Sequence, residues 1–185
     1  MLSRYTNDYI EEIIKSVMNT VKMNLELRQD HSGVNMSYNF IGNYIGVDFE
    51  RLLSSWEETH TSISLESFIK VLTIHELGHA ADRLALLESL ERTIEIFQTK
   101  KRYILSEIYN DRSLLAMLIE EHEMNITFEQ TAWINAEQVN QKYNLVHQST
   151  FSLVKKLSLE SYQKLYLEDL KLYENQLENL NEKTA

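Results

Sequence analysis

The sequence predicts a mainly α-helical domain with one small β-hairpin. Three observations support this prediction. Proline is absent from the 185 residues and only four glycines occur, so little in the chain interrupts a helix. Apolar residues recur at intervals of three and four over most of its length. Residues 34–49 differ, because they are rich in aromatic and β-branched residues and turn at Gly42-Asn43, as a hairpin does.

The predicted elements follow from the apolar spacing. Residues 5–28 carry a helical stripe that runs from Tyr9 to Leu25. After the hairpin the helical pattern returns from Ser62 to about Phe97, with a bend or break after Leu87. A long loop without structure is rare inside a compact domain, so the chain beyond this point is also expected to be helical. The segments concerned are residues 100–110 and 113–124.

The end of the chain predicts a long amphipathic helix. Its length, about four to eight turns, exceeds the three or four turns of an average helix. We expect residues 1–150 to form a single domain and residues 151–185 to form a C-terminal helix packed on it. The alternative is that this helix meets a helical partner or a second copy of the chain. Its apolar positions are Leu153, Leu157, Leu165, Leu172 and Leu177, with Tyr162, Tyr166 and Tyr173 between them.

Composition restricts the classes of partner. A net charge of −10 and a pI near 5.1 argue against nucleic acid. The absence of cysteine excludes a disulfide framework and leaves the redox compartment open. No stretch approaches the ~18 apolar residues of a membrane span, and the first residues lack the apolar core of a signal peptide. We expect a cytoplasmic protein, with release by lysis or unconventional secretion as the alternative. The sequence leaves the oligomeric state undetermined.

The segment His75-Glu76-Leu77-Gly78-His79 carries the clearest chemical signal. On a helix, His75 and His79 lie one turn apart on the same face, where both imidazoles can bind one metal ion. Glu76 projects from the flank and can act on a water there without being a ligand. The residues before the motif are strongly apolar, which predicts a buried helix. Gly78 costs about 1 kcal/mol relative to alanine in mid-helix, so we expect it to permit a close contact.

A catalytic zinc site needs a third protein ligand, which must be His, Asp or Glu in a chain without cysteine. Glu129, Ala132, Trp133 and Ala136 share one helical face that combines a carboxylate with two small residues and an indole. The small residues would let this helix lie against the motif helix, with Glu129 directed at the metal. Other ligands remain possible at Glu120, Glu121, His122 and Glu123.

These motifs resemble the zincin metallopeptidases, in the gluzincin branch whose third ligand is a glutamate on a downstream helix. The resemblance implies a zincin-like domain that binds Zn²⁺ and a short sheet whose edge strand pairs with an extended substrate. The spacing of Glu129, Ala132 and Ala136 is also similar to that of small regulatory proteases of phages and mobile elements that cleave repressors. This chain departs from that group in its longer gap between His79 and Glu129 and in Trp133, where an asparagine is common.

The sequence thus predicts a zinc metalloendopeptidase that acts on a protein or peptide substrate. His75, His79 and Glu129 are the expected zinc ligands, and Glu76 is the expected general base. Two alternatives stay open: a non-catalytic helical interaction protein that retains the fold, and a zinc hydrolase of a non-peptide substrate. Supporting roles are assigned to Tyr143 or His147 as stabiliser of the oxyanion and to Asp82 as hydrogen-bond acceptor for a ligand imidazole.

Overall fold

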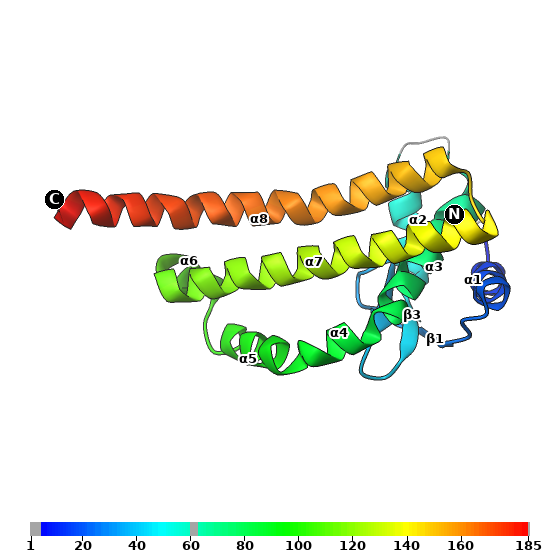
Figure 1. The fold of residues 1–185 in the computed structure, drawn as a ribbon, viewed down its shortest axis with the longest axis horizontal. Helices are drawn as coiled ribbons and strands as arrows, with labels where there is room; N and C mark the ends of the chain where they lie inside the picture. The colour runs from blue at the N-terminus through cyan, green and yellow to red at the C-terminus, as the bar shows by residue number, and fades with distance from the viewer. Residues whose placement is uncertain (1–4, 60–62, 185) are drawn as a thin grey trace. The chain divides into compact units, whose positions relative to one another are not determined.

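The computed structural model describes residues 5–59 and 63–184, with side chains up to residue 176. The molecule is mainly helical with a small sheet and a long C-terminal helix, as the sequence predicts (Figure 1). The chain divides into two compact units, which are described separately. The first consists of the N-terminal part up to Leu84 together with Thr131–Lys156, and the second consists of Ala85–Gln130 and the chain from Leu157 onward.

The first unit opens with helix α1 (Asn7–Val21), which buries one apolar face. The hydroxyl of Thr6 accepts a hydrogen bond from the backbone N–H of Tyr9 at 3.2 Å and caps the helix. The helix ends at Lys22, which adopts a left-handed conformation with φ 61° and closes the last turn. The expectation of one helix over residues 5–28 is therefore wrong beyond residue 21.

A three-stranded sheet follows in the order β1-β3-β2. The predicted hairpin is present, since β2 and β3 are antiparallel and Asn43 turns the chain with φ 54°. The sequence pattern does not predict β1, which pairs parallel with β3. Its residues are mostly polar and exposed, so no apolar alternation marks it as a strand. The strands are β1 (Glu26–Gln29), β2 (Met36–Asn39) and β3 (Tyr44–Val47).

Helix α2 (Phe49–Glu58) was not predicted, because only Phe49 and Leu52 are buried and its apolar pattern is short. The Asp48 carboxylate begins it by accepting hydrogen bonds from the backbone N–H groups of Arg51, at 3.1 Å, and Gly33, at 3.0 Å. These bonds hold the pKa of Asp48 below its usual value, and the bond from Arg51 has the larger effect. Asp48 thus joins the loop before β2 to the helix after β3.

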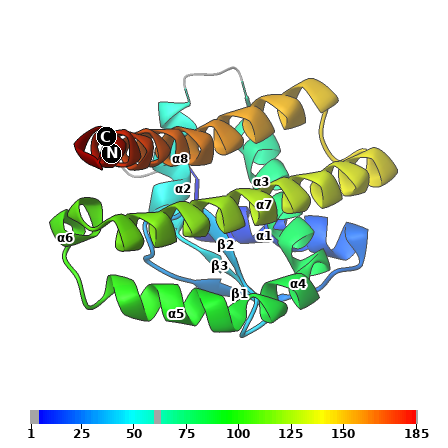
Figure 2. The same ribbon diagram turned by 60° about the vertical axis from the view of Figure 1, so that its left-hand side comes forward.

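Helix α3 (Leu65–Ala81) is the central element of the first unit. It begins at Ser64, whose hydroxyl accepts from the Ser67 N–H at 3.2 Å. Most of its residues are buried, because it packs against α1, α2 and β2 (Figure 2). The parts of α7 and α8 that belong to this unit contact each other through Trp133 and Phe151, both fully buried. The motif helix is therefore enclosed, as its apolar sequence predicts.

In the described part of the second unit, every regular element is a helix. Its core contains Ile108, Leu115 and Leu118, with Tyr173 packed against them. The helical run is interrupted at Asp82 and again at Ser89. The second interruption lies close to the bend or break expected after Leu87. The elements of this unit are α4 (Arg83–Glu88, from Ala85), α5 (Leu90–Lys100), α6 (Leu105–Asn110), and the remaining parts of α7 (Arg112–Tyr143) and α8 (Gln148–Thr184).

Candidate metal centre

The two histidines of the motif lie on α3 as the four-residue spacing requires. Their ring centroids are 4.7 Å apart and the rings are inclined by 70°. The His75 residue is only 6% exposed, and Glu76, which follows it, is 5% exposed. Two imidazoles and a carboxylate are thus held on a single buried helix, where solvent screens their interactions weakly.

Gly78 allows α7, the helix that carries Glu129, to lie close to α3. A Cβ atom at this position would lie 2.1 Å from the carbonyl oxygen of Ala132. The Asn135 side-chain amide also donates a hydrogen bond of 3.1 Å to the Gly78 carbonyl. Helices α3 and α7 therefore touch through their backbones, and Ala132 and Ala136 are fully buried. The close approach predicted from the small residues is present (Figures 1 and 2).

Glu129 lies on α7 one turn before the Ala132–Trp133 pair and is buried. It is counted with the second unit, but α7 runs unbroken from it into the first. His75, His79 and Glu129 each offer a ligand atom within 4.8 Å of the others. Zinc bonds of about 2.0–2.2 Å would place tetrahedral ligand atoms about 3.3–3.5 Å apart, so small side-chain shifts suffice. The donor set of two imidazoles and one carboxylate fits zinc.

The alternative third ligands are engaged elsewhere. Each of the four side chains between residues 120 and 123 has a partner within the second unit. The guanidinium of Arg92 holds the pKa of Glu120 below its usual value. These contacts leave Glu129 as the acidic residue of α7 that lies with the histidines. The pairs are Glu120 with Arg92, Glu121 with Lys100 at 2.6 Å, His122 with Asp169 at 2.8 Å and Glu123 with Tyr166 at 3.1 Å.

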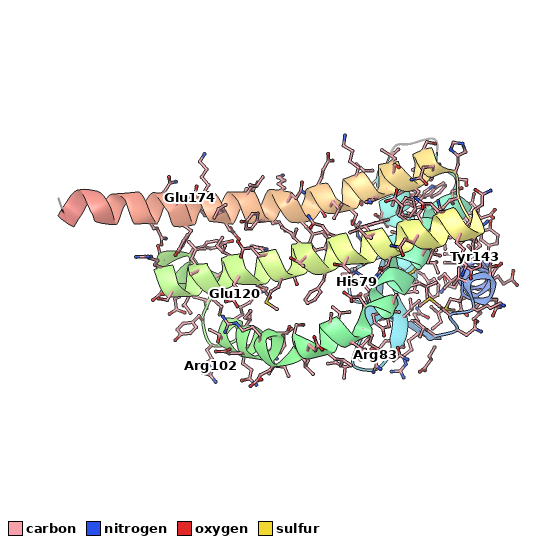
Figure 3. All side chains as sticks on the ribbon, in the orientation of Figure 1. His79, Arg83, Arg102, Glu120, Tyr143 and Glu174 are labelled. Atoms are coloured by element: carbon pink, nitrogen blue, oxygen red, sulfur yellow. The ribbon has the colours of Figure 1, made fainter. Side chains whose placement is uncertain are left out.

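The structure places two of the three expected supporting residues, Tyr143 and His147, away from the ligand atoms. Tyr143 is the last residue of α7, about 20 Å along the helix from Glu129 at a rise of about 1.5 Å per residue (Figure 3). His147 is exposed beside the start of α8, and its Nδ1 is 2.8 Å from the Ser149 hydroxyl. Asp82 ends α3, and its backbone N–H donates to the His79 carbonyl at 3.0 Å. The structure brings neither Tyr143 nor His147 into the group of ligand atoms.

Two contributions to the site were missed in the sequence. The indole of Trp133 stacks on the His75 imidazole, with centroids 4.2 Å apart and planes inclined by 20°. Arg83, the first residue of α4 and two residues after the end of α3, donates a hydrogen bond of 2.9 Å to the Phe40 carbonyl and ties this end of the motif helix to the hairpin. The position of Trp133, four residues after Glu129, was a signal for the first contact. The second joins residues distant in sequence, so local spacing gives no sign of it.

Comparisons with protein-family models, with curated proteins and with solved structures find no significant match to this chain. Within the described residues, no helix combines the length and the apolar character needed to cross a membrane.

Proposed function

We propose that the protein is a zinc-dependent metalloendopeptidase. The observation that carries the proposal is the convergence of His75, His79 and Glu129, with Glu76 buried next to the first ligand. Two imidazoles and a carboxylate leave a fourth position open, which is the arrangement of a catalytic zinc site. The resemblance of both motifs to the gluzincins supports a peptide as the substrate. A cytoplasmic location remains part of this proposal, and cell fractionation would test it.

The side chains have distinct roles in the proposed reaction. A bound zinc ion would acidify a water molecule and polarise the carbonyl group of the peptide. Glu76 accepts the proton of the attacking water and passes it to the leaving amine. His75, His79 and Glu129 lie on two helices in backbone contact, which holds their backbones at a fixed separation. The carboxylate beside the ligands therefore serves as both base and acid.

A non-catalytic interaction protein is the second candidate. The exposed leucines of α8 favour it, because Leu165, Leu167 and Leu172 are each about half exposed or more. A helix with such side chains can bind a partner helix. A zinc hydrolase of a non-peptide substrate would share the metal centre, so only the substrate distinguishes it from a peptidase.

Glu76→Gln tests the proposal, because the amide keeps the shape of Glu76 but cannot take a proton. We expect about one zinc per chain in both proteins and a ~10²- to 10⁴-fold slower cleavage of an unstructured polypeptide by the variant. Elemental analysis and gel-based cleavage assays measure the two quantities. Equal cleavage rates would exclude Glu76 as the base. Wild-type protein that binds zinc but cleaves no peptide in a broad library would favour the other two candidates.

A further inference from the structure

Trp133 connects the candidate metal centre to the core of the first unit. It follows Glu129 by one helical turn and is completely buried. One contact of its indole is the flat stack on His75, at 4.2 Å. Another is an edge-on contact with Phe151, at 5.5 Å and 76°. A single rigid side chain thus lies between a predicted ligand and the packed interior.

The stack bears on metal binding because of the geometry of imidazole. The lone pair that binds a metal lies in the plane of the ring, so the orientation of the plane decides where the nitrogen points. Rotation about the Cβ–Cγ bond of His75 would carry its ring out of the stack and into the space of the indole. Since Trp133 is fully buried, it cannot move aside without disturbing the core. Packing therefore restricts rotation about the Cβ–Cγ bond, which would otherwise misdirect the His75 nitrogen.

We propose that Trp133 is a positioning residue that holds the His75 imidazole in the plane in which His75, His79 and Glu129 converge. This inference rests on the proposed metal centre and adds a part to it. Ligand-orienting residues in other metal sites act through hydrogen bonds and contribute about 10- to 100-fold in affinity. Here the orienting contact is aromatic stacking. We expect an effect of the same order.

The chain offers well-matched substitutions. The buried Trp133 Nε1 has no hydrogen-bond partner among the described residues, so Trp133→Phe removes no such bond and keeps a flat ring. Trp133→Leu keeps an apolar side chain but removes the ring. Phe151→Leu is the control, because it removes a fully buried aromatic ring that packs on Trp133. The three variants separate ring stacking from loss of core packing.

The test measures zinc dissociation constants by competition with a chelator, together with the unfolding of the metal-free proteins in urea. Trp133→Leu should bind zinc about 10- to 100-fold more weakly than wild type, and Trp133→Phe should lie closer to wild type. Phe151→Leu should lose stability while it keeps its zinc affinity. Wild-type affinity in Trp133→Leu would overturn the inference, as would equal losses of affinity in Trp133→Leu and Phe151→Leu.

Fluorescence gives a second readout that does not depend on the stability of the leucine variant. The chain has two tryptophans, and Trp56 lies on α2 with its Nε1–H donating to the Ile63 carbonyl. Cobalt(II) bound beside His75 should strongly quench Trp133 in the Trp56→Phe protein and quench Trp56 much less in Trp133→Phe. Unquenched Trp133 in a cobalt-loaded protein would place the metal away from His75 and would overturn both the metal centre and the role of Trp133. Wild-type protein that binds neither zinc nor cobalt would overturn both the metal centre and the role of Trp133.

Discussion

At the scale of single residues, the third ligand is the most decisive prediction. We expect Glu129→Ala to weaken zinc binding by far more than the ~10- to 100-fold loss typical of residues behind the ligands. Its side chain is one of the three that offer atoms within 4.8 Å of one another. Isothermal titration of metal-free protein with zinc measures the change.

Glu120→Ala is the matched control on the same helix. Glu120 forms a two-contact ion pair with Arg92, so its removal leaves the ligand group intact. The pair is partly exposed and contributes little to stability. Full zinc affinity in Glu129→Ala, or its loss in Glu120→Ala, would mean that the ligand has been assigned to the wrong carboxylate.

Gly78 shows how one residue governs the contact between two elements. We expect Gly78→Ala to lower the free energy of unfolding by about 1–3 kcal/mol, although alanine is the better helix former by about 1 kcal/mol. The new methyl group would lie 2.1 Å from the Ala132 carbonyl oxygen and must force α3 and α7 apart. Zinc affinity should fall too, since the ligands lie on both helices. Urea unfolding and zinc titration measure the two effects.

Asn135→Ala provides the comparison for Gly78→Ala. It removes the hydrogen bond to the Gly78 carbonyl without adding an atom between the helices. Its loss of stability should be near the ~0.5–1.5 kcal/mol of one hydrogen bond. A Gly78→Ala protein as stable as wild type would show that the close contact does not hold α3 against α7.

Asp48, which caps α2, should make the stability of the protein depend on pH. Its pKa is lowered by the N–H groups of Arg51 and Gly33, so the charged carboxylate stabilises the fold. That contribution is complete above the unfolded-state pKa of about 3.9 and disappears as the pH falls through the lower folded-state value. Asp48→Asn should therefore be less stable than wild type at pH 7, with a difference that shrinks below pH ~4. Urea unfolding at both pH values tests this, and a constant difference would contradict it.

The same elements show what the sequence could reveal. Local spacing on one helix predicted the placement of His75, Glu76 and His79, and the small residues around Ala132 predicted the contact with α3. Helix α2 and strand β1 were missed because each has too few buried residues to produce a periodic signal. The spacing of Glu129 and Trp133 places the indole on the same helical face as the carboxylate, but its stacking on the His75 ring depends on how two helices cross, which no local pattern specifies.

At the scale of the whole molecule, α7 and α8 each contribute residues to both compact units. In the first unit Trp133 on α7 packs against Phe151 on α8, and in the second His122 pairs with Asp169 at 2.8 Å. The two long helices therefore take part in two separate sets of contacts, one buried and one partly buried. A change that stabilises one set of contacts therefore acts on helices that also form the other set.

Removal of zinc should consequently destabilise the protein measurably. A ligand that binds only the folded state stabilises it by about 4 kcal/mol when its free concentration is about 1,000 times its dissociation constant. We expect a chelator to lower the midpoint of thermal unfolding and added zinc to restore it, because His75, His79 and Glu129 come together only in the folded chain. Glu129→Ala should unfold at the same temperature with and without zinc. A zinc-dependent shift of equal size in that variant would place the stabilising metal at another site, and no shift in the wild type would contradict the metal centre.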